Sequence, residues 1–232
     1  MDETMQIPRS HRPHGTRAEE PARPNLAQRL LRDSAYSLSA LPIGILTFTI
    51  VVTGIAAGVG LVVVWVGLPV LVGTVLLSRA FAHLERLRLR SLQDREAPLP
   101  AYLKAEPEAS VLRRLLTPLR DPQSWFDTVW GIVGFVTGLI AFVVTITWWA
   151  AAAGGLTYWF WEQWLPVDSD NTTLAELIGL GEGRTPEIWL NLALGAFALV
   201  TLPWMARAVA TLHGGTASAM LDGRATLRES AV

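Results

Sequence analysis

The chain has 232 residues, of which 51% are hydrophobic and 17% are charged, whereas soluble domains carry about 25% charged residues. A formal net charge of −1 argues against a nucleic-acid-binding protein, and the lack of cysteine excludes disulfides, thiolate metal sites and cysteine nucleophiles. No Asp, Glu, Lys or Arg occurs in 34–78, 128–161 or 188–206. A spanning helix needs about 20 apolar residues, so these three runs predict membrane segments rather than soluble core.

Residues 1–25 combine Pro, Arg, His and Glu without apolar periodicity, which predicts a disordered cytoplasmic tail. The membrane domain is predicted over 26–223, and residues 224–232 form a second cytoplasmic tail. A cleaved signal peptide is disfavoured because a long polar segment precedes the first apolar run and a second span follows it at once. The sequence predicts no bound cofactor.

The first uncharged run is too long for one span. As a straight helix its 45 residues would reach about 68 Å, against a hydrocarbon core of about 30 Å. We therefore predict two spans, at 37–58 and 61–82, joined by a very tight turn in a region marked by Gly54, Gly58 and Gly60. A re-entrant hairpin is the alternative geometry.

The two later runs predict one span each, at 129–152 and 187–208, the latter kinked by Pro203. Between the spans lie a cytoplasmic segment, 83–128, and an outer loop, 153–186. The predicted fold class is therefore all-α, a polytopic membrane protein whose four transmembrane helices are arranged as two helical hairpins.

Basic residues indicate the orientation, because cytoplasmic flanks are enriched in Lys and Arg. Arginines crowd the first tail, the segment 83–128 and the C-terminal flank, whereas the outer loop has one, Arg184, among several acidic residues. We expect a multi-pass protein of the plasma membrane with both termini in the cytoplasm.

The cytoplasmic segment holds two candidate helices, at 83–92 and 108–119. The second gathers its apolar residues on one face with arginine opposite, which suits either the inner membrane surface or packing on a neighbouring helix. Its apolar residues are Val111, Leu112, Leu115, Leu116 and Leu119. The arginines that we expect to contact a cytoplasmic partner or lipid are Arg86, Arg88, Arg90, Arg113 and Arg114.

The two halves of the chain resemble each other, which predicts a parallel repeat of two hairpins in the same orientation. Arg32-Asp33 precedes the first span and Arg120-Asp121 precedes the third. Similarly, Arg79-Ala80-Phe81-Ala82 ends the second span and Arg207-Ala208-Val209-Ala210 ends the fourth. At a constant offset, Gly44, Phe48 and Thr53 align with Gly138, Phe142 and Thr147.

Catalytic and metal-binding patterns are missing from the sequence. None of the four histidines, His11, His14, His83 and His213, pairs at metal-ligand spacing, and the last two are expected at the membrane interface. No acid, base or nucleophile is expected to be buried in any predicted span, which counts against a coupled transporter and against an enzyme.

Two groups of apolar residues are candidate contact sites. Gly54 and Gly58, and likewise Gly134 and Gly138, are four residues apart and favour close helix packing, either within the monomer or in a homodimer. Six tryptophans are expected near the outer face, as an aromatic belt or as a pocket for a lipid-like or apolar signal. They are Trp148, Trp149, Trp159, Trp161, Trp164 and Trp189.

Several short motifs occur in an order that resembles the sensor domain of actinobacterial membrane histidine kinases. The motifs are Leu41-Pro42-Ile43-Gly44-Ile45-Leu46, Gly67-Leu68-Pro69-Val70-Leu71, Arg79-Ala80-Phe81-Ala82-His83-Leu84-Glu85 and Arg120-Asp121-Pro122-Gln123-Ser124-Trp125. The resemblance covers about 28–223. It implies a domain that perceives a membrane or envelope signal and has no catalytic residues of its own.

No phospho-accepting histidine helix or ATP-binding domain follows the last span, so we expect a sensor module that stands alone without the kinase. The favoured hypothesis is a non-enzymatic sensory or regulatory subunit of a two-component system. It would contact membrane lipids and act through a kinase, regulator or transporter. The alternatives are a small transporter or channel subunit, and a structural assembly factor of a membrane complex.

Overall fold

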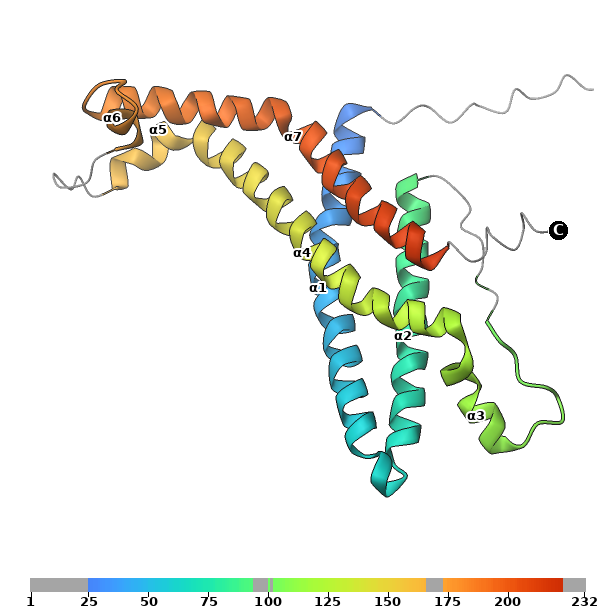
Figure 1. The fold of residues 1–232 in the computed structure, drawn as a ribbon. Helices are drawn as coiled ribbons and strands as arrows, with labels where there is room; N and C mark the ends of the chain where they lie inside the picture. Colours follow the sequence, from blue (N-terminus) through green and yellow to red (C-terminus); the bar gives the residue numbers. More distant parts are fainter. Residues whose placement is uncertain (1–24, 94–99, 101, 166–172, 223–232) are drawn as a thin grey trace, which may run out of the picture.

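The computed structural model describes residues 25–93, 100, 102–165 and 173–222, and every regular element within these ranges is a helix. Four helices are long and apolar enough to cross a membrane (Figure 1). The predicted all-α membrane fold with four spanning helices is therefore confirmed. The two predicted tails, 1–25 and 224–232, lie outside the described residues apart from Asn25.

Helix α1 (Leu26–Gly60) begins well before the predicted start of the first span at residue 37. A capping box sets this start: Gln28 donates its backbone N–H to the Asn25 side chain at 2.8 Å, and Asn25 donates its own to the Gln28 side chain at 3.1 Å. The polar residues that precede the span are therefore helical, and several of them are buried.

A short turn joins α1 to α2 (Gly67–Gln93) and contains the 3-10 segment η1 (Val62–Val64). Trp65 adopts a left-handed conformation there, with φ of 61°. A side chain at Gly67 would overlap the carbonyl oxygen of Gly58, so only glycine allows the backbones to meet at this point. The turn therefore lies after residue 60, slightly later than predicted.

Helix α3 (Val111–Arg120) is capped by Ser110, whose hydroxyl accepts the backbone N–H of Arg113 at 3.4 Å. Only Asp121 separates α3 from α4 (Pro122–Leu156), which opens on a proline in its first turn, where a missing N–H costs nothing. The predicted helix at 108–119 and the predicted third span thus correspond to α3 and to part of α4.

Beyond α4 the chain forms three short elements, α5 (Tyr158–Trp161), η2 (Glu162–Trp164) and α6 (Leu174–Leu177). It then returns as α7 (Arg184–Leu221), which contains Pro203 and changes direction partway along its length (Figure 1).

The long helices exceed the thickness of a bilayer. Helices α1 and α4 each have 35 residues and α7 has 38, which gives lengths of about 52–57 Å against a hydrocarbon core of about 30 Å. They must therefore tilt or project from the membrane, and the projecting turns are where the polar residues occur.

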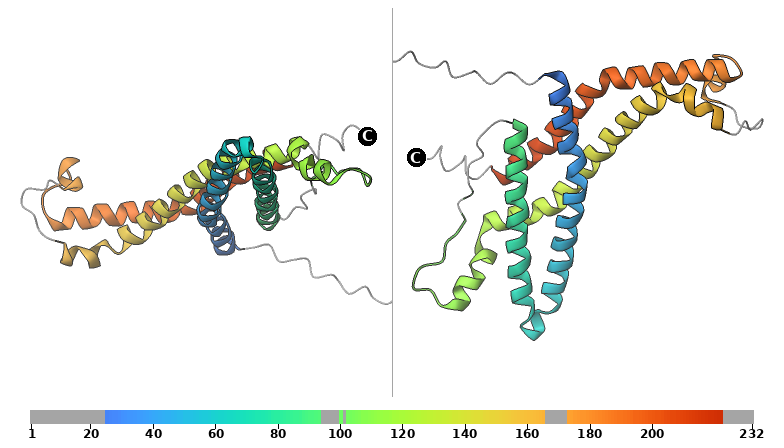
Figure 2. Two further views of the ribbon diagram at one scale, coloured as in Figure 1. Left: turned by 90° about the horizontal axis from the view of Figure 1, so that it is seen from below. Right: turned by 180° about the vertical axis from the view of Figure 1, so that it is seen from behind.

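The α1–α2 pair and the α4–α7 pair cross, and their outer ends point away from each other (Figures 1 and 2). The contacts between α1 and α4 run in opposite directions along the two helices. From one end to the other, the facing pairs are Val51 and Gly131, Gly44 and Phe135, Ala40 and Gly138, and Ser34 and Trp149. This crossing differs from the parallel packing that the internal repeat predicts.

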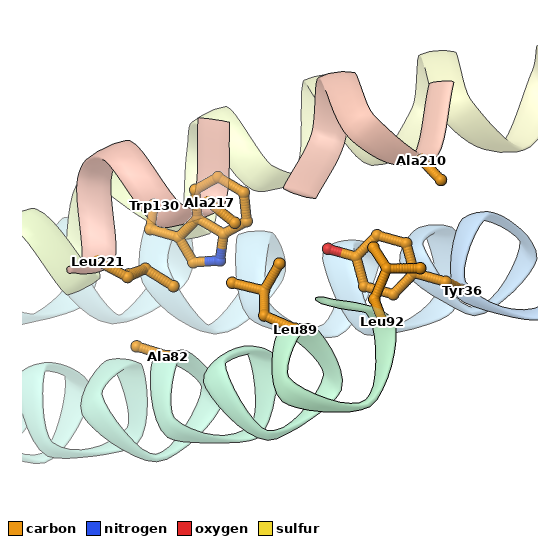
Figure 3. Close-up of a cluster of buried hydrophobic side chains, with 8 residues drawn as sticks. All are labelled: Tyr36, Ala82, Leu89, Leu92, Trp130, Ala210, Ala217 and Leu221. Carbon is orange, nitrogen blue, oxygen red and sulfur yellow. The ribbon is translucent and has the colours of Figure 1, made fainter. Parts of the chain in front are cut away.

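The buried apolar core lies where all four long helices meet. Figure 3 shows Trp130 of α4 and Tyr36 of α1 packed between side chains of α2 and α7. The remaining members of the cluster are Ala82, Leu89, Leu92, Ala210, Ala217 and Leu221. The small residues among them let the helices approach closely.

The glycines singled out in the sequence pack within one chain. Side chains at Gly54 and Gly58 would overlap Thr74 and Leu71 of α2, and one at Gly138 would press on Ala40 of α1. A side chain at Gly134 would instead meet Trp130 of its own helix. A role for these glycines in a homodimer stays a prediction.

A further close contact, between α4 and α7, was not predicted. A Cβ atom at Gly155 would lie 2.6 Å from the backbone oxygen of Asn191 and 2.7 Å from Cα of Gly195, whereas one at Gly154 would meet nothing within 4 Å. The two neighbouring glycines thus form a matched pair for testing the contact.

We expect Gly155→Ala to destabilise the detergent-purified protein by about 1–3 kcal/mol, because the new methyl group forces α4 and α7 apart. Gly154→Ala should be neutral or stabilising by up to about 1 kcal/mol, since alanine favours helix. Thermal unfolding followed by tryptophan fluorescence compares the two variants. Equal midpoints would contradict the observed packing of α4 against α7.

Candidate functional site

Charged and polar side chains, most of them buried, lie together at the inner ends of the long helices, the ends predicted to face the cytoplasm. They come from α1, α2, α4 and α7, and we call them the ionic layer. Its members are Asp33, Tyr36, Arg79, Glu85, Arg86, Arg88, Asp121, Asp127, Arg207 and His213. Burial of so many charges is tolerated only when each has a partner.

Glu85 of α2 is one centre of the ionic layer. Its carboxylate accepts the Tyr36 hydroxyl of α1 at 2.6 Å and the Arg88 guanidinium at 2.5 Å. Arg88 also donates to the backbone oxygen of Tyr36 and to the Ser39 hydroxyl, each at 2.8 Å, and lies over the Tyr36 ring. These contacts join the inner end of α2 to the first turns of α1.

His213 of α7 approaches the same carboxylate, with 3.6 Å between its Nε2 and Glu85. Its other ring nitrogen lies 2.8 Å from the Thr137 hydroxyl of α4, and its ring packs between Tyr36 and Trp130. A hollow of about 20 Å³ adjoins Glu85, Arg88 and His213, which is room for one water molecule. His213 is therefore buried in the packed core, because α7 continues past the predicted span, whereas its position at the level of the membrane interface stays a prediction.

Arg86 is the second centre, and it faces away from Glu85 because successive residues of a helix point in different directions. It donates to the Asp127 carboxylate of α4 at 2.8 Å, to the Tyr102 hydroxyl at 3.2 Å and to the backbone oxygen of Leu221 at 3.1 Å. One side chain therefore connects α2, α4, the end of α7 and the segment before α3.

Tyr102 and Asp222 complete the surroundings of Arg86. The Tyr102 hydroxyl donates to Asp127 at 2.6 Å, and partial burial together with this bond raises the Tyr102 pKa to about 12, so the phenol remains a donor at neutral pH. Asp222 lies 3.8 Å from Nε of Arg86, and burial raises the pKa of its carboxyl. Nε of Arg86 and Oδ1 of Asp222 are both buried without a hydrogen-bond partner, so this ion pair is the loosest of the group.

Two ion pairs join the halves of the chain reciprocally. Arg79, at the inner end of the second span, pairs with Asp121 at 2.9 Å, and Arg207, in the corresponding place in the second half, pairs with Asp33 at 3.3 Å. Each half therefore supplies an aspartate from the start of its first helix and an arginine from the end of its second. This exchange is the arrangement expected of two related halves that cross.

Most of the ionic layer was missed because its residues lie just beyond the predicted spans. The repeat contained a signal for its centre: the sixth residue after Arg79 is Glu85, and the sixth after Arg207 is His213. These two equivalent positions face each other in the structure.

The arginines expected to contact a partner or lipid fall into different environments. Arg86 is buried and engaged inside the protein, and Arg88 and Arg90 are half-buried. Arg113 and Arg114 of α3 are exposed. Among the five, only the arginines of α3 present most of their surface to the surroundings.

The six tryptophans do not form one group. The indole N–H groups of Trp148 and Trp149 donate to Thr201 of α7 at 3.0 Å and to Ser34 of α1 at 3.1 Å. The other four are exposed, and Trp161 and Trp164 pack around Phe160 beyond the end of α4. Trp149 thus contacts the start of α1 rather than an outer pocket, and a ligand role for the exposed rings stays a prediction.

A comparison with protein-family models finds one match, to the family described as "Putative sensor", over residues 36–221. The chain belongs to this sensor family. The matched region begins at Tyr36 and ends at Leu221, so it contains both centres of the ionic layer. No curated protein and no solved structure matches the chain.

The sensor family membership fits what the ionic layer can do chemically. In the described part of the chain, no group of three or more His, Asp or Glu residues is placed to hold a metal ion. The aspartates of the layer pair with arginines from other segments of the chain, so the pairs connect the long helices to one another. The layer is therefore a connection between elements of the sensor.

We expect Arg86→Met to destabilise the sensor by about 3–5 kcal/mol, because it leaves the Asp127 carboxylate buried without its cation. The double variant Arg86→Met/Asp127→Leu should recover at least half of that loss. Arg29→Met, at an exposed position of α1, is the control and should stay within about 0.5 kcal/mol of the parent protein. Thermal unfolding in detergent measures all three, and a double variant as unstable as the single one would contradict the pairing.

The reciprocal ion pairs should differ in strength. The Arg79 side chain is 16% exposed and also donates to Ser124 at 2.7 Å, whereas that of Arg207 is 53% exposed. Arg79→Gln should therefore cost about 2 kcal/mol, and Arg207→Gln less than about 1 kcal/mol. The same unfolding assay tests this order. Adding salt should leave the loss of stability caused by Arg79→Gln unchanged and reduce the loss caused by Arg207→Gln.

Proposed function

We propose that this protein is a non-enzymatic sensory or regulatory membrane subunit, which perceives a membrane or envelope signal and acts through a partner protein. The observation that carries the proposal is the family match over residues 36–221. Membership of a sensor family supports a role in perception rather than catalysis.

The ionic layer suggests how such a signal would cross the protein. The two helix pairs diverge at their outer ends and are joined at their inner ends by ion pairs (Figure 1). A change in the position of one pair relative to the other would therefore act on these bonds. A packed and charged interface tends to have discrete arrangements rather than a continuous range, as a signalling element requires.

Two segments on the inner side would receive that change. Tyr102, in the segment before α3, and Leu221, at the end of α7, both bond to Arg86. We propose that the segment around Tyr102 passes the signal to a kinase, a response regulator or a transporter. The Tyr102 ring also lies 4.3 Å from the Arg79 guanidinium, so this segment contacts both the central and the reciprocal ion pairs.

Affinity purification of the tagged full-length protein from its native membranes, in mild detergent, tests this function. We expect a kinase, regulator or transporter to be enriched with the parent protein and recovered at least threefold less with Tyr102→Phe, which removes the hydroxyl but keeps the ring. Tyr158→Phe is the matched control, because its hydroxyl bonds to Glu187 at the outer ends of α4 and α7. Recovery of the protein alone, or equal losses in both variants, would contradict the proposal.

One observation favours a second candidate, a small transporter or channel subunit. Glu85 and His213 are buried side by side, and buried ionisable residues in membrane proteins mark ion and proton pathways. Proton flux into liposomes that contain the purified protein decides between the two. A flux that Glu85→Gln abolishes supports transport, and a flux equal to that of empty liposomes supports the sensory function.

A further inference from the structure

Helix α3 leaves most of its apolar face uncovered. Val111 is 76% exposed, Leu112 63% and Leu115 54%, whereas Leu116 and Leu119 are half-buried. Of the two environments that the sequence allows for this helix, packing on a neighbour therefore accounts only for its last turn. Three large apolar side chains on one face of a short helix have no protein partner within the described residues.

Basic side chains flank this apolar face on both sides. Arg113, Thr117 and Arg120 follow one another at intervals of four and three residues, so they share one face of α3. Arg114 lies on the opposite flank, where it donates to the backbone oxygen of Pro107. An apolar face between basic flanks is the pattern of a helix that lies in the surface of an anionic membrane.

The flank that carries Arg113 and Arg120 is hollowed. A depression of about 160 Å³ is lined by the segment 103–106 and by α3, and its polar side chains are Lys104, Glu106, Arg113, Thr117 and Arg120. Three cations and one carboxylate face the space, and none of these four groups forms an ion pair with another described residue. The depression is therefore electropositive, because its single carboxylate cannot neutralise three cations.

The position of the depression relative to the membrane follows from the ion pair next to it. Asp121 immediately follows Arg120 and pairs with Arg79, which marks the inner end of the second span. Trp125, whose indole N–H donates to the backbone oxygen of Leu119 at 2.9 Å, is partly exposed beside α3, and tryptophan favours the membrane–water boundary. The last turn of α3 therefore adjoins the residues that the sequence predicts at the inner end of the second span.

We propose that this depression binds the phosphate of an acidic phospholipid headgroup, with the acyl chains of the lipid along Val111, Leu112 and Leu115. Arg113 and Arg120 would hold the phosphate oxygens in paired hydrogen bonds, which the planar guanidinium group favours, and Lys104 would add a point charge. The volume suits a phosphate with a small polar substituent. A lipid fits both halves of the surface, whereas a free anion would leave the apolar side chains uncovered.

Glu106 distinguishes a specific anion site from a surface that adheres to any lipid. Its carboxylate faces the same space as the three cations and repels a phosphate there. Removing that charge should tighten the binding of an acidic lipid, and removing the cations should weaken it. Each charge near a membrane surface changes affinity by about fivefold.

Native mass spectrometry of the full-length protein in a neutral detergent, titrated with phosphatidylglycerol or phosphatidylcholine, tests the site. We expect phosphatidylglycerol to bind at least tenfold more tightly than phosphatidylcholine. Lys104→Gln/Arg113→Gln/Arg120→Gln should lose at least tenfold in affinity for phosphatidylglycerol. Arg9→Gln/Arg12→Gln/Arg17→Gln, which removes the same charge from the N-terminal tail, should lose less than twofold.

The remaining outcomes separate the lipid from other anions and from general charge effects. No preference for the acidic lipid, or equal losses in both triple variants, would overturn the proposal. Displacement of the lipid by an equal concentration of glycerol phosphate would assign the site to a soluble anion and overturn it too. If the triple variant fails to fold, Glu106→Gln alone decides, since it should bind phosphatidylglycerol two- to fivefold more tightly and unchanged affinity contradicts the site.

Discussion

The packing of this protein depends on the need to keep buried charges paired where four long helices meet. Glu85, Arg86 and Asp127 have lost almost all contact with solvent, and an unpaired charge in such a place costs several kcal/mol. Glu85 also bonds to Tyr36 of α1, and Arg86 pairs with Asp127 of α4, so satisfying the charges also sets how the helices approach one another. Apolar side chains alone would allow several packings of similar energy, because lipid tails are as apolar as leucine.

The same constraint gives the sensor family fold a centre that ties the two halves together. The pairs of Arg79 with Asp121 and of Arg207 with Asp33 join opposite halves, and Glu85 and His213 meet between them. Arg86 adds the end of α7 and the segment before α3 to the same group of contacts. Elements that are distant in sequence therefore share one set of bonds where the long helices meet.

The number of spans, the class of fold and the family could be predicted from the sequence, because runs without charge and short motifs are local features. The position of the helix ends could not, because Asn25 and Gln28 extend α1 through a capping interaction that apolar periodicity does not reveal. The ionic layer was missed for the same reason: Glu85, Asp127 and His213 lie outside the apolar runs, in turns that only the folded structure shows to be buried. Their pairing also depends on how the halves cross, which no local pattern specifies. The glycine spacing indicated close packing at Gly54 and Gly58 without naming the partner helix, and the contact of Gly155 with Gly195 has no spacing signal within one helix.

The two helix pairs cross, and the end where α1 turns into α2 lies far from the end where α4 and α7 are linked (Figures 1 and 2). Each pair is therefore an arm that extends from the crossing, where the ion pairs between the two halves lie. A small rotation of one pair about the crossing moves its linked end by a distance that grows with the length of the arm.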